Sequence, residues 1–353
     1  MQKPFSLKIY LLASIFFALI SSSNVNGQST FSYLRSGIEK AERGEFKEAI
    51  IDLEKSIEIN PKNDVAYYNL GTIKGKIMQD MEVAILYFTK AIEINPNYVL
   101  AYNNRGNAKK NIGDYSGASL DYSKAIQINP YNDVSFYNRG LLKKELGDYR
   151  GANIDYTKAL ELHPRNEIAY NSRGNSRYEL LDYKAAISDY DKAIELNPNY
   201  FNSYTNRGSA KSNIGDYAGA ISDFSQVIRI NPDAKSYYNR ASIKSKLIVE
   251  RISAIDDFAK SIELDSQYFQ AYNNRGNLRK NMGDYQGAII DFNQAISINP
   301  RYAIAYYNRG VVKQEIGAGS EACNDFQSAI KFAKLGLANW IKTQISFSCL
   351  DLE

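Results

Sequence analysis

The sequence predicts an all-α solenoid built from tandem helix-turn-helix repeats. Three observations lead to this prediction: a long passage that recurs almost unchanged, a proline that returns at a fixed interval, and small residues in register between the prolines. The segment AYNNRGNAKKNIGDYSGA at residues 101–118 returns as AYNNRGNLRKNMGDYQGA at residues 271–288. A chain that needed these residues once, for one active site, would not repeat them.

The prolines mark the period. They lie mostly 34 residues apart, at Pro61, Pro96, Pro130, Pro164, Pro198, Pro232 and Pro300. Between them comes a fixed order of an aromatic residue, a glycine, an alanine and a second aromatic residue, as in Tyr102, Gly106, Ala118 and Tyr122. A period of this size is typical of a solenoid, in which each unit buries its apolar face against its neighbours.

Each repeat contains the signals for two helices. The glycine of the first and the alanine of the second are expected to let the helices cross closely, with the large aromatic residues filling the space on either side. A Gly-Asp-Tyr stretch ends the first helix, because glycine tolerates the left-handed conformation found there. The aspartate that follows is a good N-cap for the second helix. The second helix ends at Asn-Pro, since proline cannot continue a helix and restricts the residue before it. The predicted turn glycines and caps are Gly113 and Asp114, Gly147 and Asp148, Gly215 and Asp216, and Gly283 and Asp284.

These marks resemble the tetratricopeptide (TPR) repeat at nearly every position. Nine repeats occupy residues 30–336, and they begin at Thr30, Asp64, Val99, Asp133, Glu167, Phe201, Ala234, Phe269 and Ala303. The resemblance implies a right-handed superhelix. Residues 337–353 are predicted to be a capping segment. The stretch KLGLANWIKTQI at residues 334–345 lacks the marks, and its Leu335, Leu337, Trp340, Ile341 and Ile345 are expected to cover the apolar face of the last repeat.

Two repeats depart from the pattern. The second has MQDMEVA where GDYSGA is usual, which is one residue longer and lacks the turn glycine. The seventh has Ala241 for the helix glycine, Ile248 for the turn glycine and Ser266 for the proline. Two interpretations of the seventh repeat are open: a local change of superhelical pitch, or drift in a tolerant turn.

The first 27 residues are predicted to be a secretory signal peptide. A short basic start precedes an apolar core of twelve residues, Ile9–Ile20, and a small polar stretch. This core is too short to span a bilayer of ~30 Å, which takes about twenty residues. Cleavage is expected after Gly27, or alternatively after Ser23. The mature chain is then periplasmic or secreted. The alternative is an uncleaved N-terminal anchor, which would be its one membrane contact.

The composition favours neither an enzyme nor a nucleic-acid-binding protein. The net charge is +4, of which Lys3 and Lys8 belong to the N-terminal segment, so no basic footprint for nucleic acid remains. One histidine and two cysteines leave little material for a metal site, and no phosphate-binding loop or nucleophile elbow is present. His163 lies in a turn, where a solvated role is favoured over a catalytic one. We therefore expect no catalytic residues, no metal and no small-molecule cofactor.

The two cysteines lie near the end of the chain. Cys323 falls on the second helix of the last repeat and Cys349 lies just beyond the capping segment. In an oxidising compartment they can form one disulfide, and two reduced cysteines are the alternative.

An arginine and an aspartate recur together. Arginine precedes the helix glycine in repeats three to nine, at Arg105, Arg139, Arg173, Arg207, Arg240, Arg275 and Arg309. Aspartate precedes the second-helix aromatic residue in the same repeats, at Asp121, Asp155, Asp189, Asp223, Asp257, Asp291 and Asp325. Repeat two loses both, with Leu70 and Tyr87. This joint loss favours structural ion pairs between the two helices, such as Arg105–Asp121, Arg139–Asp155 and Arg275–Asp291, over ligand recognition by the arginines.

An asparagine recurs two residues before the glycine, at Asn69, Asn104, Asn138, Asn206, Asn239, Asn274 and Asn308. The resemblance implies that this position faces the inner groove, where some peptide-binding members use a ladder of asparagines. A carboxamide offers one donor group and one acceptor, which match a peptide unit. The alternative is that these asparagines are satisfied by neighbouring side chains or water. Further residues expected in the groove include Asn103, Asn273, Lys110, Lys280, Tyr137 and Tyr307.

The predicted function is that of a non-enzymatic adaptor or scaffold, which binds an extended polypeptide in its groove. This step rests on the resemblance, because a fold does not fix a function. Two alternatives are open: a structural element that associates with itself, and a module that binds carbohydrate or cell wall through tyrosines and asparagines.

Overall fold

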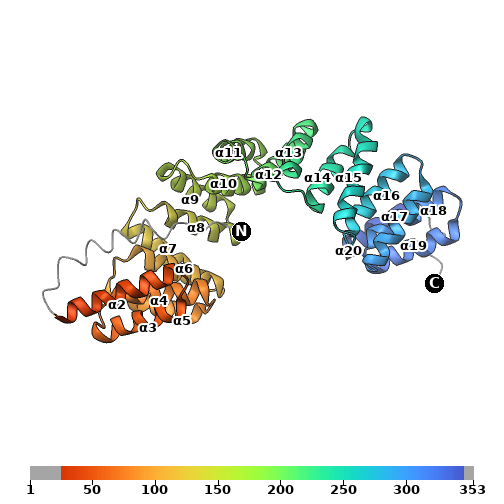
Figure 1. Ribbon diagram of the computed structural model, residues 1–353. Coiled ribbons are helices and arrows are strands. Elements are labelled where there is room, and N and C mark those ends of the chain that lie inside the picture. The colour runs from red at the N-terminus through yellow and green to blue at the C-terminus, as the bar shows by residue number, and fades with distance from the viewer. Residues whose placement is uncertain (1–24, 346–353) are drawn as a thin grey trace. The chain divides into compact units, whose positions relative to one another are not determined.

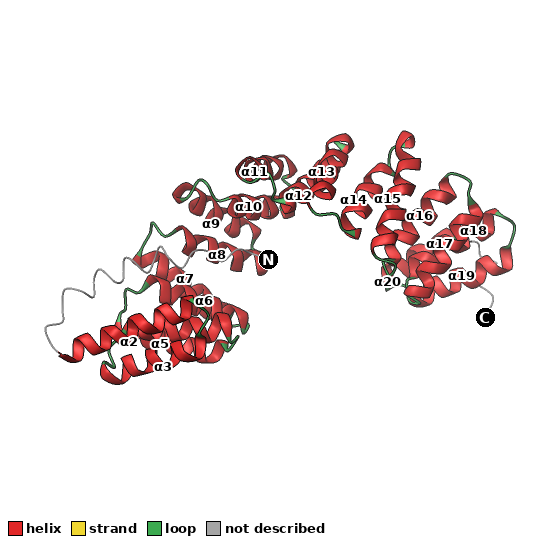
Figure 2. Ribbon diagram, in the orientation of Figure 1, coloured by secondary structure: helices red, strands yellow, loops and turns green. Residues whose placement is uncertain are grey.

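The computed structural model describes residues 25–345, and these residues form helices joined by turns, with no β-strand among them (Figures 1 and 2). The predicted all-α repeat fold is therefore confirmed. Residues 1–24 of the predicted signal peptide and Cys349 lie outside the described residues, and its last residues, Val25–Gly27, begin helix α2, so cleavage and the disulfide stay predictions.

Every repeat contains two helices, and the paired helices pack together in repeats one to four of unit one and repeats six to nine of unit two. The first helices are α2 (Val25–Glu42), α4 (Asp64–Thr72), α6 (Val99–Asn111), α8 (Asp133–Glu145), α10 (Glu167–Glu179), α12 (Phe201–Asn213), α14 (Ala234–Lys244), α16 (Phe269–Asn281) and α18 (Ala303–Glu315). The second helices are α3 (Phe46–Ile59), α5 (Met81–Ile94), α7 (Tyr115–Ile128), α9 (Tyr149–Leu162), α11 (Tyr183–Leu196), α13 (Tyr217–Ile230), α15 (Arg251–Leu264), α17 (Tyr285–Ile298) and α19 (Gly319–Phe332). Helix α20 (Leu335–Gln344) follows the last pair.

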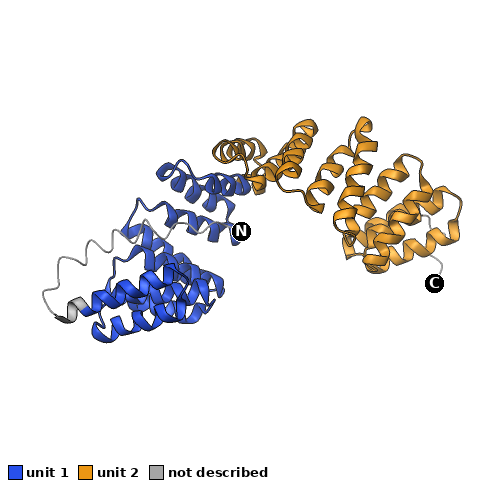
Figure 3. Ribbon diagram, viewed as in Figure 1, with its two compact units in different colours: residues 1–176 blue, residues 177–353 orange. Residues whose placement is uncertain are grey.

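The helices belong to two compact units (Figure 3). The first unit ends at Ser176 and the second begins at Arg177, so the boundary falls inside α10. No mark in the repeat pattern predicted this boundary, because repeat five keeps its spacing across it.

The turns between paired helices follow the predicted chemistry. The four predicted turn glycines have positive φ, between 80° and 84°. Each following aspartate caps the next helix, as Asp114 Oδ1 does by accepting the backbone N–H of Gly117 at 2.8 Å. Repeats two and five lack the glycine and place Gln79 (φ 57°) and Leu181 (φ 63°) in the left-handed region instead. Turn geometry is thus kept in these two repeats, whereas repeat seven, with Ile248 in place of the glycine, forms the short 3-10 helix Ile248–Glu250 instead.

Small residues allow the paired helices to approach closely. A Cβ on Gly106 would lie 2.7 Å from Cε1 of Tyr122, and one on Gly140 would lie 2.8 Å from Cε1 of Tyr156. Both tyrosines are fully buried, as are Ala118 and the other second-helix alanines in this position. The second-helix aromatic ring therefore fills the space that the missing side chain leaves, as predicted.

The hydroxyl groups of Tyr122 and Tyr156 differ in hydrogen bonding, so substitution by phenylalanine is expected to affect stability differently at the two positions. Tyr122 donates a hydrogen bond to Asn107 Oδ1 at 2.7 Å, whereas the buried hydroxyl of Tyr156 has no partner within the described residues. We expect Tyr122→Phe to lower the free energy of unfolding by about 1 kcal/mol, and Tyr156→Phe to leave it unchanged or raise it by up to about 1 kcal/mol. Urea unfolding of both variants measures the difference. Equal losses would contradict it.

The arginine and aspartate positions form bidentate ion pairs between paired helices. Arg139 Nε and Nη2 donate to Asp155 at 2.9 and 2.8 Å. The same geometry recurs, with both distances between 2.5 and 3.0 Å, in Arg105–Asp121, Arg207–Asp223, Arg240–Asp257, Arg275–Asp291 and Arg309–Asp325. All of these aspartates are buried.

Each of these aspartates also binds a second cation that sequence analysis missed. Lys143 Nζ lies 2.8 Å from Asp155, and residues four positions after the arginine make the same contact elsewhere, at Lys109, Lys211, Lys244, Arg279 and Lys313. Residues four apart share one face of a helix. The recurrent basic residue at this spacing was a signal that could have predicted the contact.

The arginines also connect neighbouring repeats. Arg139 Nη1 donates to Ser123 on the second helix of the preceding repeat at 3.2 Å, and Arg105 reaches Thr89 in the same way at 3.1 Å. The guanidinium of Arg139 stacks 5.8 Å from the ring centroid of Phe136. One side chain therefore joins three helices, which fixes the first helix relative to its neighbours.

Repeats one and two replace the ion pair in different ways. In repeat one, Asp52 accepts hydrogen bonds from Ser36 and Lys40. In repeat two, Leu70 is fully buried and Tyr87 packs against the same apolar cluster. In repeat two the arginine and the aspartate are both lost, and apolar packing of Leu70 and Tyr87 takes the place of their ion pair.

Helix α20 covers the last repeat with fewer residues than predicted. Ile341 and Ile345 are buried against Cys323 and Phe326 of α19, and Leu337 packs beside them. Leu335 is 78% exposed and Trp340 is 48% exposed, although Trp340 contacts Tyr307 with ring centroids 5.1 Å apart. The helical period explains this, because residues four apart share the buried face and Leu335 falls on the opposite one.

Candidate functional site

The candidate binding asparagines occupy one position on successive first helices. In unit one these are Asn69 on α4, Asn104 on α6 and Asn138 on α8, and in unit two Asn206, Asn239, Asn274 and Asn308 hold the same position. All seven side chains are half-buried. This position is neither in the helix-pair core nor fully in solvent, so a bound molecule can reach it.

Part of the hydrogen-bonding capacity of these asparagines is already used. Asn104 Nδ2 donates to the hydroxyl of Tyr68 at 3.0 Å, and Asn274 Nδ2 donates to that of Tyr238 at 2.9 Å. In both cases the tyrosine belongs to the preceding repeat. Asn69 Nδ2 instead donates to the backbone oxygen of Val65 at 2.8 Å. The NH₂ groups of Asn104 and Asn274 are thus held by a tyrosine of the preceding repeat, and that of Asn69 by the backbone of its own helix.

The tyrosines that hold these carboxamides are themselves packed between repeats. The Tyr68 ring lies 5.0 Å from that of Tyr98, and the Tyr238 ring lies 4.9 Å from that of Tyr268. Burial raises the pKa of Tyr98, and burial together with nearby Tyr238 raises that of Tyr268 to about 12. Tyr98 and Tyr268 therefore stay neutral at physiological pH, as packing against Tyr68 and Tyr238 requires.

Two further asparagines that we expected in the groove are buried instead. Asn103 and Asn273 are each 3% exposed. Asn103 Nδ2 donates to Ser135 of the next repeat at 2.8 Å, and Asn273 Oδ1 accepts from Asn308 at 3.0 Å. They lie one residue before the ladder position, and the rotation of 100° per residue turns them toward the following repeat.

The remaining predicted groove residues are half-buried and mostly engaged. Tyr137 shares a hydrogen bond of 3.2 Å with Ser172, and Tyr307 contacts both Phe326 and Trp340. Lys110 Nζ lies 3.3 Å from Glu145 of the next repeat. Lys280 occupies the same position in repeat eight. The residue types at these positions vary between repeats, so different repeats present different side chains to a ligand.

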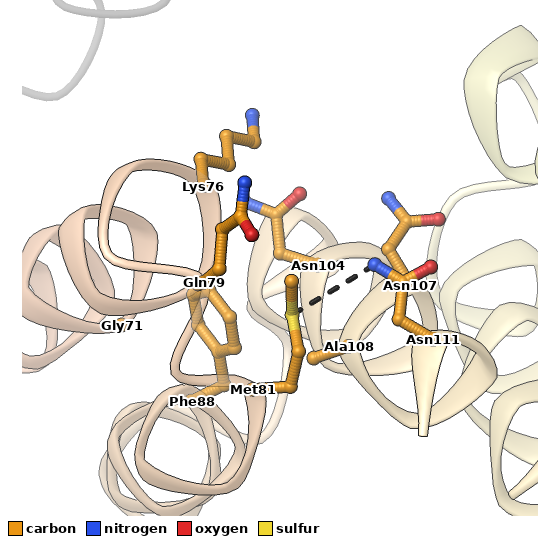
Figure 4. A pocket seen from close by; sticks show the side chains of 10 residues that line it. Gly71, Lys76, Gln79, Met81, Phe88, Asn104, Asn107, Ala108 and Asn111 are labelled. Atoms are coloured by element: carbon orange, nitrogen blue, oxygen red, sulfur yellow. Dashed lines mark hydrogen bonds between the residues drawn. The ribbon is translucent and has the colours of Figure 1, made fainter. Parts of the chain in front are cut away.

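A cavity of about 300 Å³ lies in unit one, between repeats two and three (Figure 4). Its walls come from both helices and the turn of repeat two and from α6: Gly71, Gly75, Lys76, Gln79, Met81, Phe88, Asn104, Asn107, Ala108 and Asn111. Asn104 therefore belongs both to the asparagine row and to the wall of this cavity. Sequence analysis noted the departure of repeat two but did not predict a cavity.

Three further observations on the described residues concern metal binding, membrane-spanning helices and the histidine His163. Within residues 25–345, no group of three or more histidine, cysteine or acidic side chains is placed to hold a metal ion. In the same range, no helix is both long enough and apolar enough to cross a bilayer. His163 Nδ1 lies 3.1 Å from Asp133 in an exposed turn.

Stacked helix pairs with a row of half-buried carboxamides define a class of protein, the helical-repeat scaffold. The chain belongs to the tetratricopeptide repeat family. Family models described as TPR repeat match residues 37–77 and 276–317, and models described as tetratricopeptide repeat match residues 65–98, 99–132, 134–166, 168–200 and 189–222. Proteins of this family bind other proteins or peptides and are typically non-catalytic, so the chain is a protein–protein interaction scaffold in this general sense.

Solved structures agree on the fold. PilF of Pseudomonas aeruginosa is 20% identical with a TM-score of 0.54, over 61% of this chain and 97% of that one. A tetratricopeptide repeat protein from Parabacteroides merdae is 24% identical with a TM-score of 0.52, over 67% of this chain and 94% of that one. At these identities the likeness shows the fold alone. A search of curated proteins finds none that matches this chain.

Proposed function

We propose that this protein is a non-enzymatic adaptor that binds an extended polypeptide along the first helices of its repeats. The row of half-buried asparagines supports this proposal most directly. The periodicity matters because a polypeptide offers the same N–H and C=O groups at every residue. A repeated carboxamide can therefore hold a backbone with little dependence on its sequence.

The hydrogen bonds of Asn104 explain how the row would be ready for a ligand. Its Nδ2 donates to Tyr68, and this bond fixes the plane of the carboxamide. Oδ1 then remains as an acceptor for a backbone N–H of the partner. Because the side chain is held before binding, less conformational entropy is lost when the partner arrives.

We further propose that the protein works outside the cytoplasm. The basic start and the apolar stretch Ile9–Ile20 support this location. N-terminal sequencing of the exported protein tests it. A mature chain that begins at Gln28 agrees with cleavage after Gly27, and a chain that stays in the cytoplasm contradicts the proposal.

The experiment that tests the binding mode removes four carboxamides at once, in Asn104→Ala, Asn138→Ala, Asn206→Ala and Asn239→Ala combined. The probe is a fluorescein-labelled library of random nonapeptides, and binding is measured by fluorescence anisotropy. Each lost hydrogen bond costs about 0.5–1.5 kcal/mol, so we expect the affinity for bound peptides to fall at least about tenfold.

A control variant changes three exposed asparagines that lie away from the row, Asn97, Asn199 and Asn324, to alanine. We expect this variant to bind as the unchanged chain does. If the fourfold variant is folded and binds peptides with unchanged affinity, the asparagine row is not the binding device.

A further inference from the structure

The cavity in unit one arises from residues that are peculiar to repeat two. Met81 follows the N-cap, where Tyr115, Tyr149, Tyr183, Tyr217 and Tyr285 stand in other repeats. Gly75 replaces a longer side chain, which is Lys110 in repeat three and Lys280 in repeat eight. Repeat two therefore lacks two side chains that would occupy this space.

The extra residue of repeat two is accommodated by a wider helical turn, which follows α4 and lies beside the cavity. Residues Ile73–Ile77 form a short π-helix, in which the backbone N–H of Met78 donates to the oxygen of Ile73 at 3.2 Å. A Cβ on Gly75 would lie 3.1 Å from that of Ala84. Glycine thus lets the widened turn lie against α5, and the floor of the cavity is left unfilled.

The floor of the cavity is apolar and its rim is rich in carboxamides. Met81, Phe88 and Ala108 provide the apolar surface. In Figure 4 the carboxamides of Gln79, Asn104, Asn107 and Asn111 surround the thioether of Met81.

The rim offers both donors and acceptors to a ligand, because Asn104 and Asn111 each use an N–H, toward Tyr68 and Met81 Sδ, and keep Oδ1. Asn107 Oδ1 is occupied by the Tyr122 hydroxyl, so Asn107 presents its NH₂ group. None of the residues that line the cavity is acidic. The donors suit the carbonyl and carboxylate oxygens of a ligand.

One cation lies at the mouth of the cavity. Lys76 extends away from the floor in Figure 4, and its side chain is exposed. At the mouth of the cavity this ammonium can reach an anionic group of a ligand that occupies the cavity.

We propose that this cavity anchors one apolar side chain of the bound polypeptide, of leucine to phenylalanine size, with an acidic residue beside it that pairs with Lys76. The cavity volume of about 300 Å³ lies at the lower limit of ligand pockets, which suits a single large side chain. The inference rests on the proposed function, because Asn104 would hold the adjoining backbone. The cavity then gives the sequence preference that a row of asparagines lacks.

The test fills the cavity with residues that other repeats already carry at the same positions. Met81→Tyr installs the tyrosine of repeat three, and Ala108→Leu installs the leucine found at Leu142 and Leu278. The probe is a positional-scanning library of fluorescein-labelled nonapeptides, presented to the full chain. The unchanged chain should select leucine, methionine or phenylalanine at one position, with aspartate or glutamate next to it.

Both filling variants should lose the apolar preference, and their affinity for the selected peptide should fall by about tenfold or more, as expected for one large apolar side chain left unburied. Lys76→Asn, which installs the residue of Asn111, should lose the acidic preference alone. Lys124→Asn makes the same change of charge on the exposed face of α7 and should alter neither preference.

The outcomes separate this inference from the proposed function. If peptides bind, and a folded filling variant selects the same residues with the same affinity as the unchanged chain, the anchor site is wrong and the adaptor function stands. If no peptide of either library binds the unchanged chain, both proposals fail. Loss of the apolar preference in both filling variants, while binding to the asparagine row persists, supports the anchor site.

Discussion

Asp155→Asn is expected to destabilise the fourth repeat by about 2–3 kcal/mol. Asp155 is 1% exposed and accepts hydrogen bonds from Arg139, with Lys143 as a second cation at 2.8 Å. Removing one partner of a buried ion pair costs about 3–5 kcal/mol when the other is left unpaired, and the partial exposure of Arg139 and Lys143 reduces this value. Hydrogen exchange of α8 and α9 measures the change locally, and urea unfolding measures it for the whole chain.

The matched control is Asp148→Asn in the same repeat. Asp148 caps α9 by accepting the N–H of Gly151 at 2.9 Å, and asparagine caps a helix as well as aspartate does. The same chemical change should therefore have little effect there. If Asp155→Asn left exchange and unfolding unchanged, the arginines would be available for ligand recognition, which was the alternative interpretation of their periodicity.

The second large effect is expected at the helix crossing of the last repeat. A Cβ on Gly310 would lie 2.7 Å from Cε1 of Phe326, a ring that is 1% exposed. Gly310→Val should lower the free energy of unfolding by about 1–3 kcal/mol, because a packed core resists added volume. Repeat seven carries Ala241 over the buried Phe258, so one methyl group is accommodated and valine is the sharper test.

Gly319→Val provides the control in the same repeat. A Cβ on Gly319 would meet no atom within 4 Å, and this residue begins α19. We expect its unfolding free energy to change by no more than about 0.5 kcal/mol. Equal losses in the two variants would show that the effect comes from the residue type, with no role for the contact to Phe326.

These stability effects matter for binding because the ion pairs position the candidate site. Arg139 joins α8 to α9 and reaches Ser123 of the preceding repeat, and Asn138 stands next to it in the chain. A loosened ion pair should therefore also shift the neighbouring carboxamide. The same arrangement holds around Arg105 and Asn104.

The repeat pattern predicted features that depend on contacts within one helix pair. The turn glycines, the aspartate N-caps and the crossing of Gly106 over Tyr122 follow from spacing alone, because residues at fixed offsets on two paired helices must meet. The basic residue four positions after each arginine obeys the same rule, so its contact with the aspartate could also have been predicted from the sequence.

Features that depend on the next repeat were less predictable. Asn103 and Asn104 are adjacent and identical in type, yet one donates to Ser135 of the following repeat and is buried, while the other donates to Tyr68 of the preceding one. Composition cannot distinguish them. Their difference comes from the rotation of the helix against two different neighbours.

The sequence by itself determined that this protein is built from paired helices, where most of them begin and end, and which small residues face which rings. It could do so because these contacts are local and recur with one period. Only the tertiary structure decided which carboxamides are half-buried and which are buried, and that a cavity lies beside Met81. A cavity depends on which side chains of two neighbouring repeats face each other, and packing between the repeats sets the distance between them.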